Sequence, residues 1–204
     1  MGKMAYVILL VLLQFTGNHS PVPKTIIFFG DSITAGYGLD PKSAYPEVVK
    51  GRLLKENMDV NVINAGLSGE TTAGGATRIS WILRQPVDIF VLELGGNDGL
   101  RGLPLEQTEK NIQLIIDKVK AKNPKVKIVV AGMQVPPNLG EEYTTKFKNI
   151  FPRIVSKNKA TLIPFLLQGV AGDEKLNLAD GIHPNVEGHR IVAENVLEVI
   201  RPML

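Results

Sequence analysis

The chain of 204 residues contains no cysteine, a single tryptophan and only 6% aromatic residues. The absence of cysteine excludes a disulfide, a thiolate nucleophile, a cysteine-ligated zinc and a lipid-modified cysteine. It leaves the redox compartment open, because disulfide-free proteins fold in every compartment. Excess charge of one sign is also lacking, since the net charge is +3 and no stripe of Lys and Arg alternates with aromatic residues. Nucleic acid is therefore not an expected partner.

Hydrophobic residues make up 44% of the chain and charged residues 21%, which is typical of one globular domain with a substantial core. Internal repeats, low-complexity tracts and linkers are absent after residue 24. The sequence therefore predicts a single domain over residues 24–204. The pI near 9.0 comes mostly from lysines scattered over residues 110–159, which we interpret as solvated helix faces.

The only long apolar run lies in the N-terminal segment, residues 1–20, where Lys3 precedes a mostly apolar stretch over 4–15. As a helix this stretch measures about 18 Å, well short of the roughly 30 Å hydrocarbon core of a bilayer. It resembles the core of a signal peptide and predicts a periplasmic or secreted protein. No Ala-x-Ala cleavage pattern follows it. The alternatives are a retained anchor that contacts a membrane surface through residues 4–15, or an apolar strap packed on the domain.

After residue 24 the hydrophobic pattern alternates between strand and helix. Helices are expected to carry apolar residues at three-to-four spacing, as Ile112, Ile115, Ile116 and Val119 do. The expected strands are 25–29, 59–64, 87–93, 126–131 and 161–163, and the expected helices are 43–56, 71–84, 105–121, 141–158 and 185–200. Helical crossovers between strands imply right-handed βαβ units, a mainly parallel sheet and helices on both faces of it. The predicted fold class is a three-layer α/β/α sandwich.

Polar residues follow four of the apolar segments, at points that a parallel sheet brings to one edge. They are Ser32 in Gly-Asp-Ser, Gly66 in Asn-Ala-Gly, Asn97 in Gly-Gly-Asn-Asp, and His183 in Asp-Gly-Ile-His-Pro. Open α/β sheets build their sites at this edge. Taken singly, each residue has a plain structural interpretation: Asp31 or Ser32 as a helix cap, Asn97 as a turn residue, Gly66 as a tight turn. Together, in this order, they favour one site.

A serine hydroxyl becomes a nucleophile when a base removes its proton, and histidine suits that role near neutral pH. An acceptor must hold the histidine in the correct tautomer, and Asp180 lies three residues before His183. Acyl transfer also needs preorganised donors for the oxyanion. The candidate donors are the Ser32 N–H, the Gly66 N–H and the Asn97 side-chain amide.

These motifs resemble those of the SGNH, or GDSL-type, serine esterases and lipases, over roughly residues 24–204. The match is most specific at residues 95–102 and at Gly132-Met133-Gln134, and it is nearest to the bacterial thioesterase I/lysophospholipase and arylesterase branch. The resemblance implies a flavodoxin-like fold, Ser32 as nucleophile, His183 as base, Asp180 as its orienting group, and Ser32, Gly66 and Asn97 as oxyanion donors. Ile33 stands where the family often has leucine. The Gly-x-Ser-x-Gly elbow of α/β-hydrolases is absent.

The segment 132–143 is long for a connection between a strand and a helix, and it borders the expected site. Val135, Pro136, Leu139 and Tyr143 are therefore candidates to line an acyl groove, the alternative being a rigid surface loop. We interpret His189 as a helix-surface residue. A metal site from Asp180, His183 and His189 matches no familiar ligand spacing, so neither a metal nor a cofactor is expected.

The sequence thus predicts a serine hydrolase of carboxylic esters or thioesters, acting on aryl esters, short-to-medium acyl esters, lysophospholipid or acyl-CoA through an acyl-Ser32 intermediate. The apolar loops favour these substrates over acetylated carbohydrates, which remain an alternative. Two alternatives from other classes are a non-catalytic flavodoxin-like binding module and a membrane-tethered interaction protein.

Overall fold

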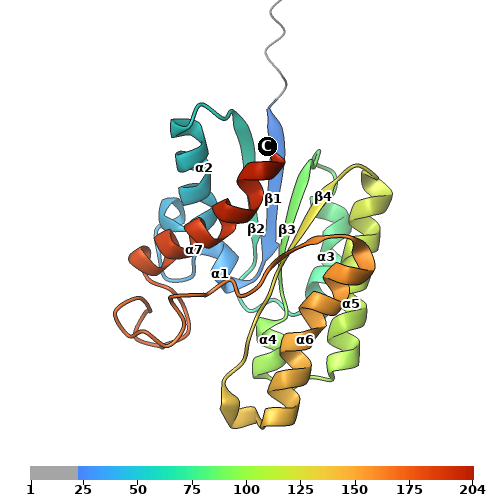
Figure 1. Cartoon of the computed structure of the whole chain (residues 1–204), viewed down its shortest axis with the longest axis vertical. Helices are drawn as coiled ribbons and strands as arrows, with labels where there is room; N and C mark the ends of the chain where they lie inside the picture. The colour runs from blue at the N-terminus through green and yellow to red at the C-terminus, as the bar shows by residue number, and fades with distance from the viewer. Residues whose placement is uncertain (1–22) are drawn as a thin grey trace, which may run out of the picture.

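In a computed structural model, which describes residues 23–204, five parallel strands form one open sheet in the order β2-β1-β3-β4-β5 (Figure 1). Their bounds are β1 Lys24–Gly30, β2 Val60–Gly66, β3 Ile89–Glu93, β4 Lys127–Ala131 and β5 Thr161–Ile163. Every pairing is parallel, including that of β1 with β2 and with β3. The predicted strands and the sheet are confirmed, with shifts of a residue or two at the ends.

Helices cover both faces of the sheet, so the predicted three-layer sandwich is also confirmed (Figure 1). The longer helices are α2 Tyr45–Lys55, α3 Thr72–Ile82, α5 Leu105–Lys122, α6 Glu141–Asn158 and α7 Val186–Ile200. Two short ones follow β1 and β3, namely α1 Ser32–Ala35 and α4 Gly96–Leu100, and three 3-10 turns cover Pro41–Ser43, Pro137–Leu139 and Arg201–Met203. Helices α2 and α7 pack together over one face, and α3, α5 and α6 pack over the other.

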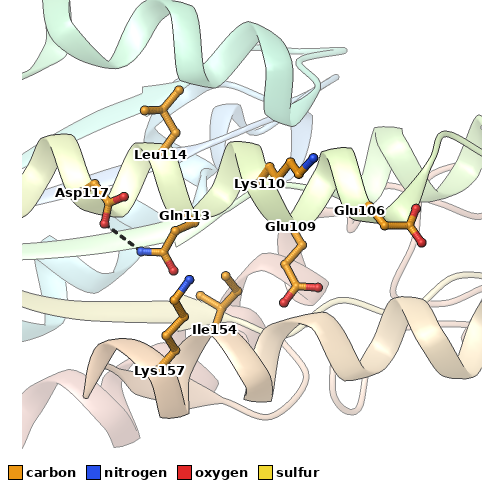
Figure 2. A pocket seen from close by; sticks show the side chains of 8 residues that line it. All are labelled: Glu106, Glu109, Lys110, Gln113, Leu114, Asp117, Ile154 and Lys157. Carbon is orange, nitrogen blue, oxygen red and sulfur yellow. Dashed lines mark hydrogen bonds between the residues drawn. The ribbon is translucent and has the colours of Figure 1, made fainter.

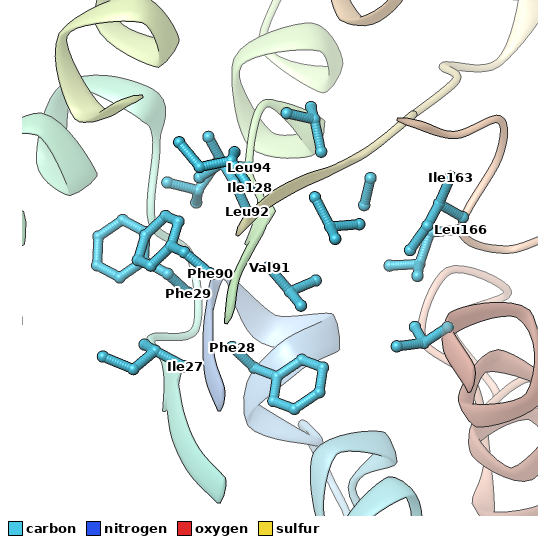
Figure 3. Close-up of a cluster of buried hydrophobic side chains, with 14 of the residues drawn as sticks. Ile27, Phe28, Phe29, Phe90, Val91, Leu92, Leu94, Ile128, Ile163 and Leu166 are labelled. Carbon is cyan, nitrogen blue, oxygen red and sulfur yellow. The ribbon is translucent and has the colours of Figure 1, made fainter. Parts of the chain in front are cut away.

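The two central strands form the middle of the hydrophobic core. Both β1 and β3 are buried along almost their whole length, as their uninterrupted apolar sequences predict for strands covered on both faces. Phe29 and Phe90 pack against each other with ring centroids 5.6 Å apart, and Phe28 points to the other side (Figure 3). There Phe28 packs edge-on against Tyr45. This packing holds the carboxyl ends of β1 and β3 in a defined register, with Gly30 beside Glu93.

The N-terminal segment 1–20, expected to be a signal peptide or anchor, lies outside the described residues. No helix within residues 23–204 is both long enough and apolar enough to cross a membrane.

Candidate active site

Ser32 is the first residue of α1, directly after the Gly30-Asp31 turn that ends β1. The helix starts there because Asp31 caps it: the Asp31 carboxylate accepts a hydrogen bond from the Ile33 N–H at 3.1 Å. Within residues 23–204, the Ser32 N–H has no hydrogen-bond acceptor. The Ser32 side chain is 9% exposed and lies at the wall of a cavity. A hydroxyl and a free backbone donor therefore sit together at the site.

The structure brings His183 and Asp180 to Ser32 across 151 residues of sequence. Nε2 of His183 lies 2.8 Å from Ser32 Oγ, and Nδ1 lies 2.7 Å from Asp180 Oδ2. A carboxylate only accepts hydrogen bonds, so Nδ1 carries the imidazole proton and Nε2 accepts from the serine hydroxyl. This is the arrangement that a base-activated serine requires.

The loop 178–183 holds Asp180 in place. Its Oδ1 accepts the His183 N–H at 3.0 Å and the Ile182 N–H at 2.9 Å. These backbone bonds, with the His183 ring, lower the pKa of Asp180 to about 2, so the group is ionised at neutral pH. The loop closes on itself through the Leu178 N–H, which donates to the His183 carbonyl at 2.8 Å. The Tyr37 ring packs against the His183 ring at a tilt of 41°, with ring centroids 4.6 Å apart.

Asn97 lies in α4, and its side-chain amide points to the Asp31 side of the site. Nδ2 donates to Asp31 Oδ2 at 3.1 Å and to the Glu70 carbonyl at 3.0 Å. The neighbouring Asp98 anchors α4, because its buried carboxylate accepts from the Thr72 N–H and hydroxyl and from the Thr108 hydroxyl. Asn97 is therefore held beside Ser32, with both amide hydrogens engaged.

The structure differs from the prediction for Gly66. The Gly66 N–H is already engaged, because it donates to Asn64 Oδ1 at 3.0 Å. Gly66 is the last residue of β2, paired with Gly30, and a Cβ there would lie 2.2 Å from the Ala35 nitrogen. It is glycine because α1 packs directly on the strand end.

A second glycine of the same loop, Gly69, fits the donor role better. It lies beyond the strand, at φ +79°, and within residues 23–204 its N–H has no acceptor. Its neighbour Glu70 accepts the Asn97 amide, and Arg101 donates to the Gly69 carbonyl at 3.2 Å. Sequence reasoning missed it because the strand was expected to end at residue 64, which placed Gly66 in the turn. In the structure β2 extends to Gly66, and Gly69 is the glycine that lies past the strand.

A cavity of about 640 Å³ opens beside Ser32, and most of its wall is apolar. Besides the site residues, its lining includes Leu100, Met133, Val135, Pro136, Phe165, Leu167 and Ile182. Two of the four predicted groove residues, Val135 and Pro136, thus line it. Leu139 and Tyr143 do not, because the loop turns away after Pro136 into a 3-10 turn and α6. The Tyr143 hydroxyl instead donates to the Leu103 carbonyl at 3.0 Å.

The interpretation of His189 as a surface residue is wrong. It is 1% exposed, and its Nδ1 accepts the Tyr45 N–H at 3.1 Å where α7 packs on the start of α2. No trio of His, Asp or Glu side chains within residues 23–204 is arranged to hold a metal ion.

Another hollow, of about 400 Å³, lies between α5 and α6 (Figure 2). Its lining holds charged and amide side chains but no serine or histidine, and Gln113 bonds to Asp117 there. Lys110 and Lys157 line it as well, in keeping with solvated helix faces. The hollow offers no group for acyl transfer.

An open parallel sheet that carries a hydrogen-bonded Ser-His-Asp set at its carboxyl edge, with free backbone donors nearby, defines a serine hydrolase. Comparison with known proteins agrees. The chain belongs to the GDSL-like lipase/acylhydrolase family, whose model matches residues 28–191. The resemblance noted in the sequence is thereby confirmed.

Curated relatives match nearly the whole chain. Esterase TesA of Pseudomonas aeruginosa is 37% identical over 182 residues, covering 89% of this chain and 90% of the relative. An arylesterase of Vibrio mimicus is 33% identical, covering 93% and 94%. Thioesterase 1/protease 1/lysophospholipase L1 of Escherichia coli is 33% identical, covering 96% and 90%. The crystal structure of TesA superposes with a TM-score of 0.85, covering 89% of this chain and all of that one.

Proposed function

We propose that this protein is a serine esterase that hydrolyses carboxylic esters or thioesters through an acyl intermediate on Ser32. The observation that carries the proposal is the continuous hydrogen-bonded set from Ser32 Oγ through His183 to Asp180, at 2.8 and 2.7 Å. Asp180 orients the ring and stabilises the imidazolium that forms when Nε2 takes the serine proton.

The reaction follows from this geometry in two half-reactions. Ser32 Oγ attacks the acyl carbon, and His183 Nε2 takes the hydroxyl proton. When the tetrahedral intermediate collapses, His183 gives that proton to the departing alcohol or thiol, and the acyl group stays on Oγ. A water molecule then replaces the leaving group, His183 takes one of its protons, and the carboxylic acid is released as the proton returns to Ser32.

The oxyanion of each tetrahedral intermediate needs donors on the side of Ser32 away from His183. The Ser32 N–H and the Gly69 N–H have no acceptor within residues 23–204, and both suit this role. Asn97 is the third proposed donor, and it serves by redirecting to the oxyanion one N–H that bonds to Asp31. One donor of this kind contributes about 3–4 kcal/mol to transition-state stabilisation in a well-studied protease.

The cavity supports substrates with an apolar acyl or aryl group. Leu100, Met133, Val135, Phe165 and Ile182 surround the space beside the serine, and its volume is in the range that holds drug-sized ligands. The relatives named esterase, arylesterase and thioesterase/lysophospholipase point to the same chemical classes. An acetylated carbohydrate would leave most of this apolar wall unfilled.

The test compares wild type with Ser32→Ala on 4-nitrophenyl acetate, butyrate, octanoate and palmitate and on palmitoyl-CoA. We expect turnover of several of these by wild type, a maximum at medium chain length, and loss of turnover in Ser32→Ala. Absence of turnover on every substrate by folded wild-type protein would overturn the proposal. Undiminished turnover by Ser32→Ala would overturn the assignment of the nucleophile.

A further inference from the structure

A second acidic side chain lies behind the site, and the reaction described above does not use it. Glu93 is the last residue of β3 and is completely buried. Its Oε2 accepts the Asp31 N–H at 3.1 Å and the Thr34 hydroxyl at 2.8 Å. Both donors belong to the segment that carries Ser32, so Glu93 holds that segment directly.

The segment is built around this carboxyl group. Gly30 pairs with Glu93 in the sheet, and a Cβ on Gly30 would lie 2.4 Å from Glu93 Oε2. The same Cβ would lie 2.1 Å from Thr34 Oγ1, so the glycine of the Gly-Asp-Ser motif is required by the acid together with the threonine that donates to it. Thr34, which donates to Oε2, also lies 2.9 Å from the buried hydroxyl of Tyr45, which extends the polar cluster toward α2.

The other oxygen of Glu93, Oε1, indicates the protonation state of the carboxyl group. Within residues 23–204 the buried Oε1 has no hydrogen-bond donor, a costly situation for a carboxylate oxygen. The neighbouring acid is Asp31, whose backbone N–H donates to Glu93 Oε2 and whose carboxylate accepts from Asn97. A proton on Glu93 would provide the missing partner, because an acid O–H donates and the Asp31 carboxylate accepts.

We propose that Glu93 is a positioning residue whose neutral carboxyl group donates a hydrogen bond to the Asp31 carboxylate, and that the pair thereby fixes the segment that carries Ser32 and holds Asn97 beside it until the oxyanion forms. The inference rests on the esterase activity proposed above. Two acidic groups buried side by side do not both ionise, so the pair carries one negative charge. A second negative charge on the pair would repel the oxyanion that forms beside Asn97.

The direction of the pKa shifts agrees with this charge state. Burial and the nearby Asp31 raise the pKa of Glu93 well above its usual range, and burial raises the pKa of Asp31 to about 6. The titratable groups that face the pair are Tyr45, which is neutral because burial raises its pKa, and His183, whose positive form favours ionised Asp31. Glu93 is thus the member that keeps its proton at neutral pH.

The kinetic test uses Glu93→Gln and Glu93→Leu, each checked for folding by circular dichroism and melting temperature. Glu93→Gln keeps a neutral donor, so we expect at least a third of the wild-type kcat at pH 7. Glu93→Leu removes the donor, and we expect kcat to fall about 100-fold with little change in KM. At alkaline pH, kcat of wild type falls as Glu93 ionises, whereas Glu93→Gln lacks this component.

Equal loss of kcat in the two variants, or the same alkaline decline in wild type and Glu93→Gln, would overturn the proposal. Failure of the proposed function is distinct, since wild type itself would then not turn over esters.

A spectroscopic test needs neither turnover nor the leucine variant. The infrared difference spectrum between wild type and Glu93→Gln at pH 7 is expected to contain the carbonyl band of a neutral carboxylic acid. The control is Glu142→Gln, because Lys146 lowers the pKa of exposed Glu142 and keeps it ionised. Its difference spectrum is expected to contain only carboxylate bands. Carboxylate bands alone in the Glu93 difference spectrum would overturn the proposal.

Discussion

At the scale of single residues, the chemistry depends on the tautomer of His183. One Asp180 oxygen accepts from His183 Nδ1 and the other accepts two backbone N–H groups, so three nitrogen atoms of one short loop set the position of the carboxylate. The carboxylate is therefore an orienting group, and no proton needs to move onto it during turnover.

Replacing Asp180 by Asn tests this role. An amide presents an N–H or an uncharged oxygen to Nδ1, so the tautomer with Nε2 free to accept from Ser32 is lost or weakened. We expect kcat to fall by about 10³–10⁴-fold with KM nearly unchanged, as for the equivalent change in serine proteases. Ester turnover at saturating substrate measures this, and a loss below tenfold would contradict the orienting role.

The sequence was sufficient to predict the residues whose chemical type is distinctive. Ser32, Asn97, Asp180 and His183 each follow a glycine-rich or proline-flanked break, and the structure brings them together. Glu93 was missed because it ends an apolar strand and no local pattern distinguishes it. Its partners come from β1 and α1, so only the register of the sheet reveals it.

At the scale of elements, two close contacts hold the site's framework together. One is the contact of α1 with the end of β2, which leaves no space for a side chain at Gly66. The other is the contact of α7 with the start of α2, where His189 accepts the Tyr45 N–H.

Gly66→Ala tests the first contact. The new Cβ would meet backbone atoms, at 2.2 Å from the Ala35 nitrogen, so the backbone must shift. We expect the free energy of unfolding to decrease by about 1–3 kcal/mol, as for overpacking in general. Urea denaturation measures it.

The matched control is Gly51→Ala in α2, where a Cβ meets nothing within 4 Å and the better helix former is expected to raise stability by about 0.5–1 kcal/mol. Equal stability of Gly66→Ala and wild type would contradict the close packing.

The second contact gives the stability a pH dependence. Burial lowers the pKa of His189 from 6.5 to about 4, so the unfolded chain binds this proton first as the pH falls. The contribution of His189 to the free energy of unfolding is fully present above pH 6.5 and is lost as the pH falls to about 4. The loss is roughly 3 kcal/mol, because each pKa unit corresponds to about 1.36 kcal/mol. Asp31 acts with the opposite sign, since its raised pKa favours proton uptake by the folded state between about pH 6 and 4.

His189→Gln isolates this contribution, because Asp31 is present in both proteins. Denaturant unfolding at pH 7, 5.5 and 4 is expected to reveal a decline in wild type relative to the variant. Parallel curves for the two proteins would contradict the burial of a neutral imidazole.

Periodicity predicted the five longer helices and the strands, but not the short helices α1 and α4. The burial of His189 was not predicted either, although its spacing from apolar residues indicated it. His189 precedes Val192, Ala193, Val196 and Ile200 at three, four, seven and eleven residues, so it lies on the buried face of α7. The bend after Pro136 had no such signal. Leu139 and Tyr143 were expected at the groove, and the 3-10 turn and α6 carry them away from it.

At the scale of the whole molecule, one parallel sheet gathers loops from distant parts of the sequence into a single site. The order β2-β1-β3-β4-β5 places β1 and β3 centrally, so the segments that follow them, with Ser32 and Asn97, are neighbours. The loop before α7 then brings His183 over Ser32. Topology predicted this convergence without any knowledge of side-chain contacts.

The apolar segment 4–15 leads to a prediction for the whole chain in a bacterial cell. If it directs export, the protein recovered from the periplasm or medium lacks roughly the first twenty residues. Intact-mass measurement of C-terminally tagged protein from each cell fraction measures this. Recovery of the full-length mass, in the membrane fraction alone, would contradict export and favour the anchor.

The central claim is that Ser32 forms a covalent acyl intermediate, and its most direct test is labelling by a phosphonate ester, which stops at the first half-reaction. Intact-mass and peptide analysis of wild type are expected to find one phosphonyl group for each chain, on the peptide that contains Ser32, with proportional loss of ester turnover. Ser32→Ala is expected to remain unlabelled, and His183→Ala to label far more slowly. Labelling at another residue, or full loss of turnover without a label on Ser32, would contradict the account.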